Sequence, residues 1–98
     1  MQTYPFVPNF VNVAPLEHGV YLLFAFGELI YIGRAFGLGV TIRSRLQSHL
    51  AGWEGPCTQA ATDFSWLISF TPATDEAMLL AEYKRQHGRL PRCNDRIG

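Results

Sequence analysis

The feature that most constrains this chain is the stretch Gly19–Arg34, GVYLLFAFGELIYIGR, in which two strand-forming runs lie almost end to end. Val20–Phe26 and Leu29–Ile32 are built from β-branched, aromatic and aliphatic residues that favour strands. Gly27-Glu28 separates them and is typical of a tight turn. The stretch therefore predicts a β-hairpin.

The remaining pattern predicts three further regular elements. A helix is expected from an N-cap at Thr41 to about Leu50, because Ile42, Leu46 and Leu50 recur every four residues. A third strand is expected over 64–70. A second helix is expected from Thr74 to about His87, with Gly88 as its C-terminal stop.

The resulting order is β-β-α-β-α, which predicts an α+β fold with a small three-stranded antiparallel sheet. Such a sheet is not stable alone, so we expect helices to cover one of its faces. Residues 1–18 contain three prolines and are expected to form an extended arm in front of a domain of residues 19–98. The apolar residues of this arm predict that it packs on the domain or on a second copy.

Composition limits the class of protein. The chain has 98 residues, 48% of them apolar, as expected for one folded domain. The longest apolar run is too short for a bilayer, and the N-terminus has no signal-peptide pattern. We therefore expect an intracellular, cytoplasmic protein with no membrane partner. Cys57 and Cys93 form no CxxC motif, and without an export signal we interpret both as thiols.

The net charge is zero, which argues against a general polyanion binder. The first 33 residues contain no Lys or Arg. The basic residues fall in two groups: Arg34, Arg43 and Arg45, then Lys84, Arg85, Arg89, Arg92 and Arg96. One basic face would result if the fold brought the groups together; the alternative is two solvated helix surfaces.

Two triplets in the hairpin carry a tyrosine beside a glycine: GVY ends at Tyr21, and YIG begins at Tyr31. Further along follow Arg45 in the first helix, Glu82 in the second, and Asn94 three residues after a proline. This ordered set resembles the GIY-YIG nuclease superfamily over residues 19–94. Each triplet alone is weak evidence, whereas the ordered combination is specific.

The resemblance implies roles for these residues. Glu82 would be the single protein ligand of Mg²⁺ or Mn²⁺, although most helix glutamates are simply solvated. Tyr31 or Tyr21 would help to deprotonate the attacking water, and the alternative is two rim tyrosines of the core. Arg45 would stabilise charge on the phosphate. His49, one turn after Arg45, is a further catalytic candidate.

Three more residues are candidates for contact with the substrate. Arg34 stands where the family often has lysine. Arg43 is the alternative to Arg45, because the preceding loop is longer than is common in the family. Asn94 resembles the family's structural or site-orienting asparagine.

The function implied is a metal-dependent endonuclease acting on duplex or branched DNA and leaving 5′-phosphate and 3′-hydroxyl ends. The alternative is a non-catalytic nucleic-acid-binding or protein-interaction domain on the same fold. Family members often carry a separate DNA-binding module, and only four residues follow Asn94 here. Specificity would then come from a homodimer or a partner protein.

A shared site requires both tyrosines on one face of the sheet, and strand alternation makes this testable. A two-residue turn at Gly27-Glu28 would place Tyr31 opposite Phe24 and on the wrong face. An odd loop, or a β-bulge, would place Tyr31 opposite Leu23 and on the face of Tyr21. We predict the second arrangement.

Overall fold

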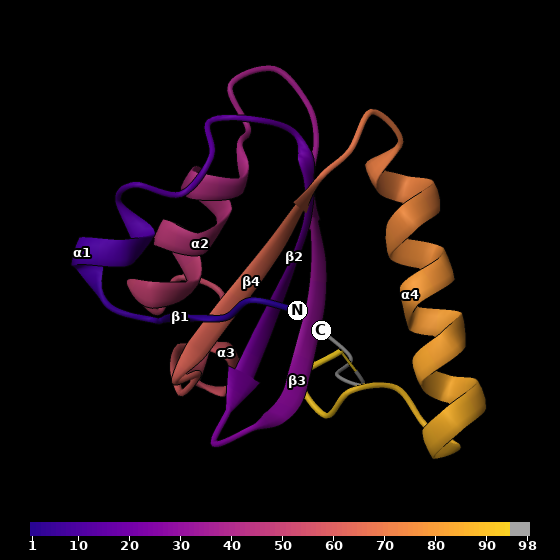
Figure 1. Cartoon of the computed structure of the whole chain (residues 1–98). Coiled ribbons are helices and arrows are strands. Elements are labelled where there is room, and N and C mark those ends of the chain that lie inside the picture. The colour runs from indigo at the N-terminus through magenta and orange to yellow at the C-terminus, as the bar shows by residue number, and fades with distance from the viewer. Residues whose placement is uncertain (95–98) are drawn as a thin grey trace.

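The computed structural model describes residues 1–94 and shows an antiparallel sheet between two layers of helices (Figure 1). The sheet order is β1-β4-β2-β3, formed by β1 (Tyr4–Pro5), β2 (Gly19–Ala25), β3 (Glu28–Ala35) and β4 (Asp63–Ile68). The helices are α1 (Pro8–Val11), α2 (Ile42–Leu50), α3 (Pro56–Gln59) and α4 (Pro72–His87). The α+β class is confirmed, with four strands in place of three.

The additional strand comes from the N-terminal segment, which is not the extended arm expected. Tyr4 and Pro5 pair with β4, and α1 follows with a proline at its start, where no backbone N–H is needed. Phe6, Val11 and Ala14 are buried in the same core cluster as β2. The segment therefore belongs to the core of the domain.

Helices cover both faces of the sheet, and the expectation of one covered face is wrong. Tyr21 and Leu23 of β2 face α2, whereas Val20 and Leu22 face α4 and contact Tyr83. Figure 1 shows α4 alone on one side of the sheet and α1, α2 and α3 on the other. The reason is that β2 is an inner strand with apolar side chains on both faces, and each face must be kept from water.

The hairpin turn lies one residue earlier than predicted. Ala25 pairs with Glu28, so the turn residues are Phe26 and Gly27. Their φ angles are 49° and 85°, the combination that a type I′ turn requires. This turn matches the right-handed twist of the strands, even though phenylalanine is a poor residue for positive φ.

A β-bulge then corrects the register of the hairpin. Phe24 pairs with Leu29, but Leu23 pairs with Tyr31, so Ile30 is an extra residue on β3. The bulge moves Tyr31 to the face of Tyr21. The prediction that Tyr31 lies opposite Leu23 is therefore confirmed.

The start of α2 and the stop of α4 lie where the sequence predicts them. Thr41 and Ser44 form a capping box at the start of α2, and Gly88 adopts a left-handed conformation after α4. The start of α4 differs, because Pro72 occupies its first turn and the helix begins two residues before Thr74. No helix within residues 1–94 combines the length and apolar character needed to cross a membrane.

Cys57 and Cys93 form a disulfide, which corrects their interpretation as thiols. The bond joins α3 to the segment after α4, with the Cα atoms 5.8 Å apart. The spacing of cysteines in the sequence excludes only local motifs. It could not reveal that the fold brings two distant segments together.

Candidate active site

Four of the predicted residues converge on one face of the hairpin. Tyr21 comes from β2, Tyr31 from the bulged part of β3, and Arg45 and His49 from successive turns of α2. The Tyr21 hydroxyl lies 2.9 Å from Nε2 of His49. The ring centroid of Tyr31 lies 5.0 Å from that of His49 and 6.1 Å from that of Tyr21. The charge of Arg45 lowers the pKa of both tyrosines, so α2 presents a cation and an imidazole to the two phenols.

The glycines of the two triplets are required by close packing. A Cβ on Gly33 would lie 2.5 Å from the Tyr21 hydroxyl and 2.7 Å from the ring of Tyr31. A Cβ on Gly19 would lie 2.2 Å from the carbonyl oxygen of Leu67 on β4. Gly33 thus makes the space into which both phenol rings fit, and Gly19 lets β2 and β4 pair.

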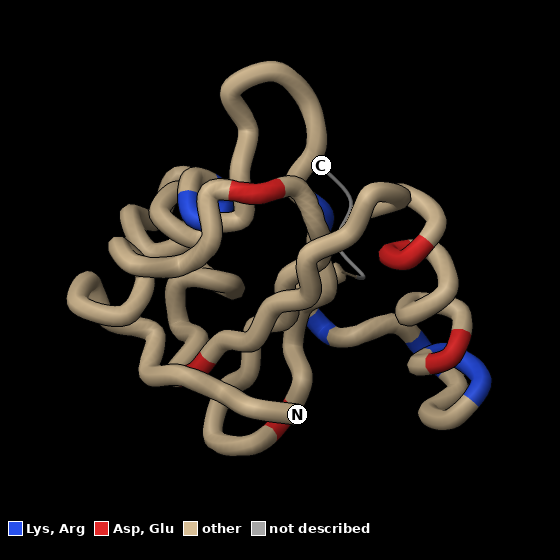
Figure 2. The backbone as a smooth tube through the Cα atoms, turned by 45° about the horizontal axis from the view of Figure 1, so that its top comes forward, with Lys and Arg blue, Asp and Glu red and all other residues tan. Residues whose placement is uncertain are grey.

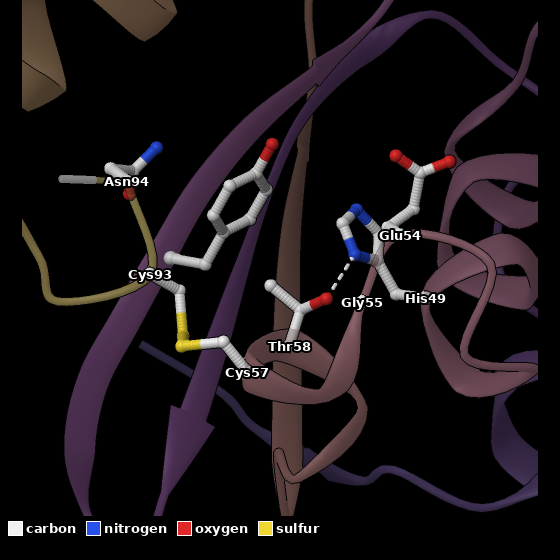
Figure 3. A pocket seen from close by; sticks show the side chains of 8 residues that line it. His49, Glu54, Gly55, Cys57, Thr58, Cys93 and Asn94 are labelled. Atoms are coloured by element: carbon white, nitrogen blue, oxygen red, sulfur yellow. Dashed lines mark hydrogen bonds between the residues drawn. A yellow bond between two sulfur atoms is a disulfide. The ribbon is translucent and has the colours of Figure 1, made fainter. Parts of the chain in front are cut away.

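A pocket of about 380 Å³ opens beside this cluster (Figure 3). Its wall combines the hairpin, the α2–α3 region and the segment after α4. The lining residues are Tyr31, His49, Glu54, Gly55, Cys57, Thr58, Cys93 and Asn94. Tyr31 reaches this pocket, whereas Tyr21 is 1% exposed and lies behind it.

The two tyrosines differ in how easily they would ionise. Burial raises the pKa of Tyr21 far above its ordinary value, and the neighbouring Tyr31 raises it further. Burial also raises the pKa of Tyr31, and the charge of Arg45 opposes the rise at both phenols. Both phenols are therefore harder to ionise than a free tyrosine, and Tyr31 is the one that lines the pocket.

His49 is neutral near pH 7. Burial lowers its pKa to about 4, and the positive charge of Arg45 acts in the same direction. Its ring is held at both nitrogens, by Tyr21 at Nε2 and by Thr58 at Nδ1. The imidazole therefore serves as a fixed hydrogen-bonding group within the cluster.

Glu54 is a site residue that the sequence analysis missed. It lies in the loop between α2 and α3, and its Oε2 is 3.3 Å from Nη1 of Arg45. The hydrogen bond from Arg45 lowers the pKa of this carboxyl. No periodicity marks a loop residue, so the sequence offered no signal for it.

Two glutamates of α4 have different surroundings. The side chain of Glu76 is 19% exposed and is paired with Arg34 of β3. The charge of Glu76 raises the pKa of Tyr31. Glu82 has 46% exposed and is paired with Arg85 on its own helix, with the pKa lowered by that bond. Six helical residues separate the two, about 9 Å along the axis and about 120° around it. Glu76 is thus the α4 carboxylate whose charge reaches Tyr31, whereas Glu82 is paired at the surface with Arg85.

The three predicted substrate contacts have distinct positions. Arg34 lies at the exposed edge of β3 beside Glu76, 3.1 Å from its Oε1. Arg43 points to the N-terminal segment, where its Nε donates to the carbonyl of Ala14 at 2.8 Å. The choice between Arg43 and Arg45 therefore falls on Arg45 as the arginine near the tyrosines.

Asn94 uses both ends of its amide to hold β3. Its Oδ1 accepts from the N–H of Ile32 at 2.8 Å, and its Nδ2 donates to the Ile32 carbonyl at 2.9 Å. The N–H of Cys93 bonds the carbonyl of Ile30, the extra residue of the bulge. The segment after α4 therefore fixes the backbone on both sides of Tyr31.

The basic residues do not gather on one face within the described part of the chain. Figure 2 shows them on the side of α2, near the middle of the molecule and at the far end of α4. Four arginines (Arg34, Arg45, Arg85 and Arg92) are each paired with a glutamate. Arg96, counted in the second basic group, lies outside the described residues.

The carboxylates near the cluster are the groups that could hold a cation. No set of three or more His, Cys, Asp or Glu with metal-binding geometry occurs within residues 1–94. Glu76 and Glu54 are the carboxylates whose charges reach Tyr31, and their hard oxygen donors suit Mg²⁺ better than a soft metal.

Comparisons with known proteins bear on the fold. No protein-family model matches the sequence, and no curated protein matches it. Among solved structures, this chain is similar to the GIY-YIG N-terminal endonuclease domain of UvrC from Thermotoga maritima. A point mutant of that domain, bound to its catalytic divalent cation, superimposes with a TM-score of 0.61 at 22% identity. The match covers 90% of this chain and 93% of that one.

The magnesium-bound structure of the same Thermotoga maritima domain gives a TM-score of 0.59 at 22% identity, covering 87% of this chain and 91% of that one. Both matches cover most of each chain. This chain therefore has the fold of a GIY-YIG endonuclease domain.

Proposed function

We propose that this protein is a metal-dependent endonuclease that hydrolyses phosphodiester bonds of DNA. The observation that carries the proposal is the cluster of Tyr21, Tyr31, Arg45 and His49, two of which line one pocket of an endonuclease-type fold. A binding module would have no need for two phenols held against a buried, neutral imidazole.

Tyr31 is the residue that accepts a proton from the attacking water. It lines the pocket, and its phenol lies near the charge of Arg45, which favours the phenolate. Tyr31 first releases its own proton to solvent in the pocket, because only the phenolate can accept a proton from the attacking water. Tyr21 is fully enclosed and cannot reach a water in the pocket, so it acts by holding Tyr31.

Arg45 stabilises the negative charge that develops on the phosphate. Its guanidinium is partly exposed beside the pocket and is held by Glu54. A guanidinium that is already oriented by Glu54 loses little conformational freedom when it binds the phosphate in the transition state. Arg34 at the edge of β3 is placed for a neighbouring phosphate.

Glu76, in place of Glu82, is the residue proposed to hold Mg²⁺ or Mn²⁺. Its carboxylate lies close enough to Tyr31 to affect the pKa of the phenol, and a single carboxylate with waters and phosphate oxygens suits Mg²⁺. When bound, the cation would polarise the phosphate and neutralise the leaving oxygen. In-line attack would then leave 5′-phosphate and 3′-hydroxyl ends.

The solved structures with this fold support a role for the tyrosines. They include point mutants in which one of three tyrosines is replaced by phenylalanine, or an asparagine by alanine, each with the catalytic cation bound. Two of those tyrosines are ten positions apart, as are Tyr21 and Tyr31. The relatives therefore share the kind of residue on which the proposal rests.

The test is cleavage of supercoiled and branched DNA with Mg²⁺ or Mn²⁺, using a matched pair of variants. Glu76→Gln should abolish cleavage and Glu82→Gln should leave it unchanged, because only the first lies beside Tyr31. The reverse result would restore Glu82 as the metal ligand. DNA binding without cleavage by the wild type under any of these conditions would favour the non-catalytic domain.

The partner that supplies specificity is proposed to be a second copy of the chain or another protein. The domain is neutral and its arginines at the pocket are paired, so alone it would hold a duplex weakly. Light scattering with and without DNA distinguishes a homodimer from a monomer that needs a partner.

A further inference from the structure

Trp53 is a large apolar side chain that the fold leaves in solvent. It lies in the loop between α2 and α3, and 81% of it is exposed. The other tryptophan, Trp66, is half-buried, packs against the core and stacks on the ring of Tyr4 with the two planes 7° apart. A single exposed apolar residue is not unusual by itself. What distinguishes Trp53 is where the fold holds it.

The backbone of Trp53 is fixed to the end of α2. The helix ends in a Schellman motif: the N–H of Gly52 donates to the carbonyl of His49 at 3.1 Å, and the N–H of Trp53 donates to the carbonyl of Ser48 at 3.1 Å. Gly52 has a φ of 84°, the left-handed conformation that the motif requires. The residue in the position of Trp53 commonly packs on an apolar residue of the last turns, but the two positions for that partner hold Ser48 and Gln47. The helix cap therefore makes no use of the indole.

The same loop forms part of the pocket. Glu54 and Gly55 line it, and Oε2 of Glu54 lies 3.3 Å from Nη1 of Arg45. Figure 3 shows Glu54 on the same side of the pocket as His49. Adjacent Cα atoms are about 3.8 Å apart, so the indole begins one residue away from the carboxylate that orients Arg45. A DNA strand with its phosphate at Arg45 would bring a flanking nucleotide within reach of Trp53.

An exposed indole in this position fits a nucleobase. Aromatic side chains hold single strands by stacking on successive bases, with little dependence on which base is present. This chain has zero net charge and its Arg45 is already paired, so stacking would supply affinity that charge does not. Both faces of a base in an intact duplex are covered by its neighbours, and exposing one costs unstacking energy. An unpaired base offers a face without that cost.

We propose that Trp53 is a substrate-binding residue that stacks on an unpaired base next to the scissile phosphate. The substrate class is then DNA with single-stranded bases at the cleavage point, such as a flap, a branch or a single strand, in preference to an intact duplex. The inference rests on the proposed function for the identity of the substrate, whereas the stacking itself can be observed without any cleavage.

The test is the fluorescence of the indole while DNA is added in the presence of EDTA, so that no divalent cation is available for cleavage. The chain has two tryptophans, so Trp66→Phe leaves Trp53 as the single reporter. A single-stranded oligothymidylate should quench the emission of this variant, and a duplex of the same length should quench it much less. Trp53→Phe, which keeps only Trp66, is the matched control and should show no quenching.

The affinity for the same labelled oligothymidylate, measured by fluorescence anisotropy, is the second readout. Trp53→Ala should weaken binding on the order of tenfold, and Trp53→Phe should retain most of the affinity because a ring remains. Phe70→Ala removes another fully exposed aromatic ring, one that lines a different pocket, and should leave the affinity unchanged. Binding of the duplex should be the same in all three variants.

Unchanged emission of Trp53 on addition of the single strand, or an equal loss of affinity for single strand and duplex in Trp53→Ala, would overturn the inference. A shift of Trp53 emission with protein concentration in the absence of DNA would also overturn it, because the indole would then belong to a contact with a second copy of the chain. If the wild type cleaves DNA while Trp53 does not respond, only the proposed function stands. If Trp53 responds and nothing is cleaved with Mg²⁺ or Mn²⁺, the stacking stands and the catalytic proposal fails.

Discussion

The disulfide between Cys57 and Cys93 gives the prediction with the best-defined magnitude. The two cysteines are separated by 36 residues, and closing a loop of that length in the unfolded chain removes an entropy worth about 4 kcal/mol at 25 °C. Domains of this size have unfolding free energies of roughly 5 to 15 kcal/mol, so the loss would be a large share of the total. We expect Cys57→Ala/Cys93→Ala to fold, with the midpoint of urea unfolding strongly lowered.

The assay is urea unfolding followed by circular dichroism, with and without a dithiol reductant. Reductant should lower the unfolding free energy of the wild type by about 4 kcal/mol and leave the double variant unaffected. The same treatment should weaken the site, because the bond braces α3 and the segment that holds β3 through Asn94. Two titratable thiols in the unfolded wild type without reductant, or no response of its stability to reductant, would refute the reasoning.

Three further predictions concern single elements. Phe26→Asn should raise the unfolding free energy by about 1 kcal/mol, seen as a higher Tm, because asparagine tolerates the positive φ that phenylalanine adopts there and the replaced ring is exposed. Thr41→Ala should lower it by about 1 kcal/mol in urea unfolding, since the N-cap bond to the backbone of α2 is lost. His49 has a pKa of about 4 when folded and about 6.5 when unfolded, so the free energy of unfolding should fall as pH drops from about 6.5 to about 4. In urea unfolding at both pH values, His49→Asn should flatten this dependence.

Local chemistry explains what the sequence could predict. The strands of the hairpin, the Thr41 cap and the Gly88 stop each depend on a few neighbouring residues, and all three occur as expected. The ordered set of Tyr21, Tyr31 and Arg45 also predicted residues that lie close together beside the pocket. The register prediction succeeded because side chains alternate strictly along a strand, so a shared site required a bulge.

The choice between the two glutamates depended on tertiary structure. Both lie on α4 near its buried stripe, and nothing local distinguishes them. The position of α4 against the sheet brings the charge of Glu76 within reach of Tyr31, which is the basis of the proposal for Glu76. Glu82 is one and two-thirds turns further on and is paired with Arg85.

The sequence by itself determined the hairpin, β4, the two long helices and which residues form the tyrosine cluster, whereas the tertiary structure decided the contacts between distant segments. The N-terminal segment became part of the core because the edge of β4 and the face above it needed covering. Cys57 bonds to Cys93, and Thr58 hydrogen-bonds His49, because the fold brings α3 close to the segment after α4 and to α2 at the pocket. Propensities, caps and turns are properties of neighbouring residues, but such contacts exist only once all elements have packed, and no local pattern can encode them.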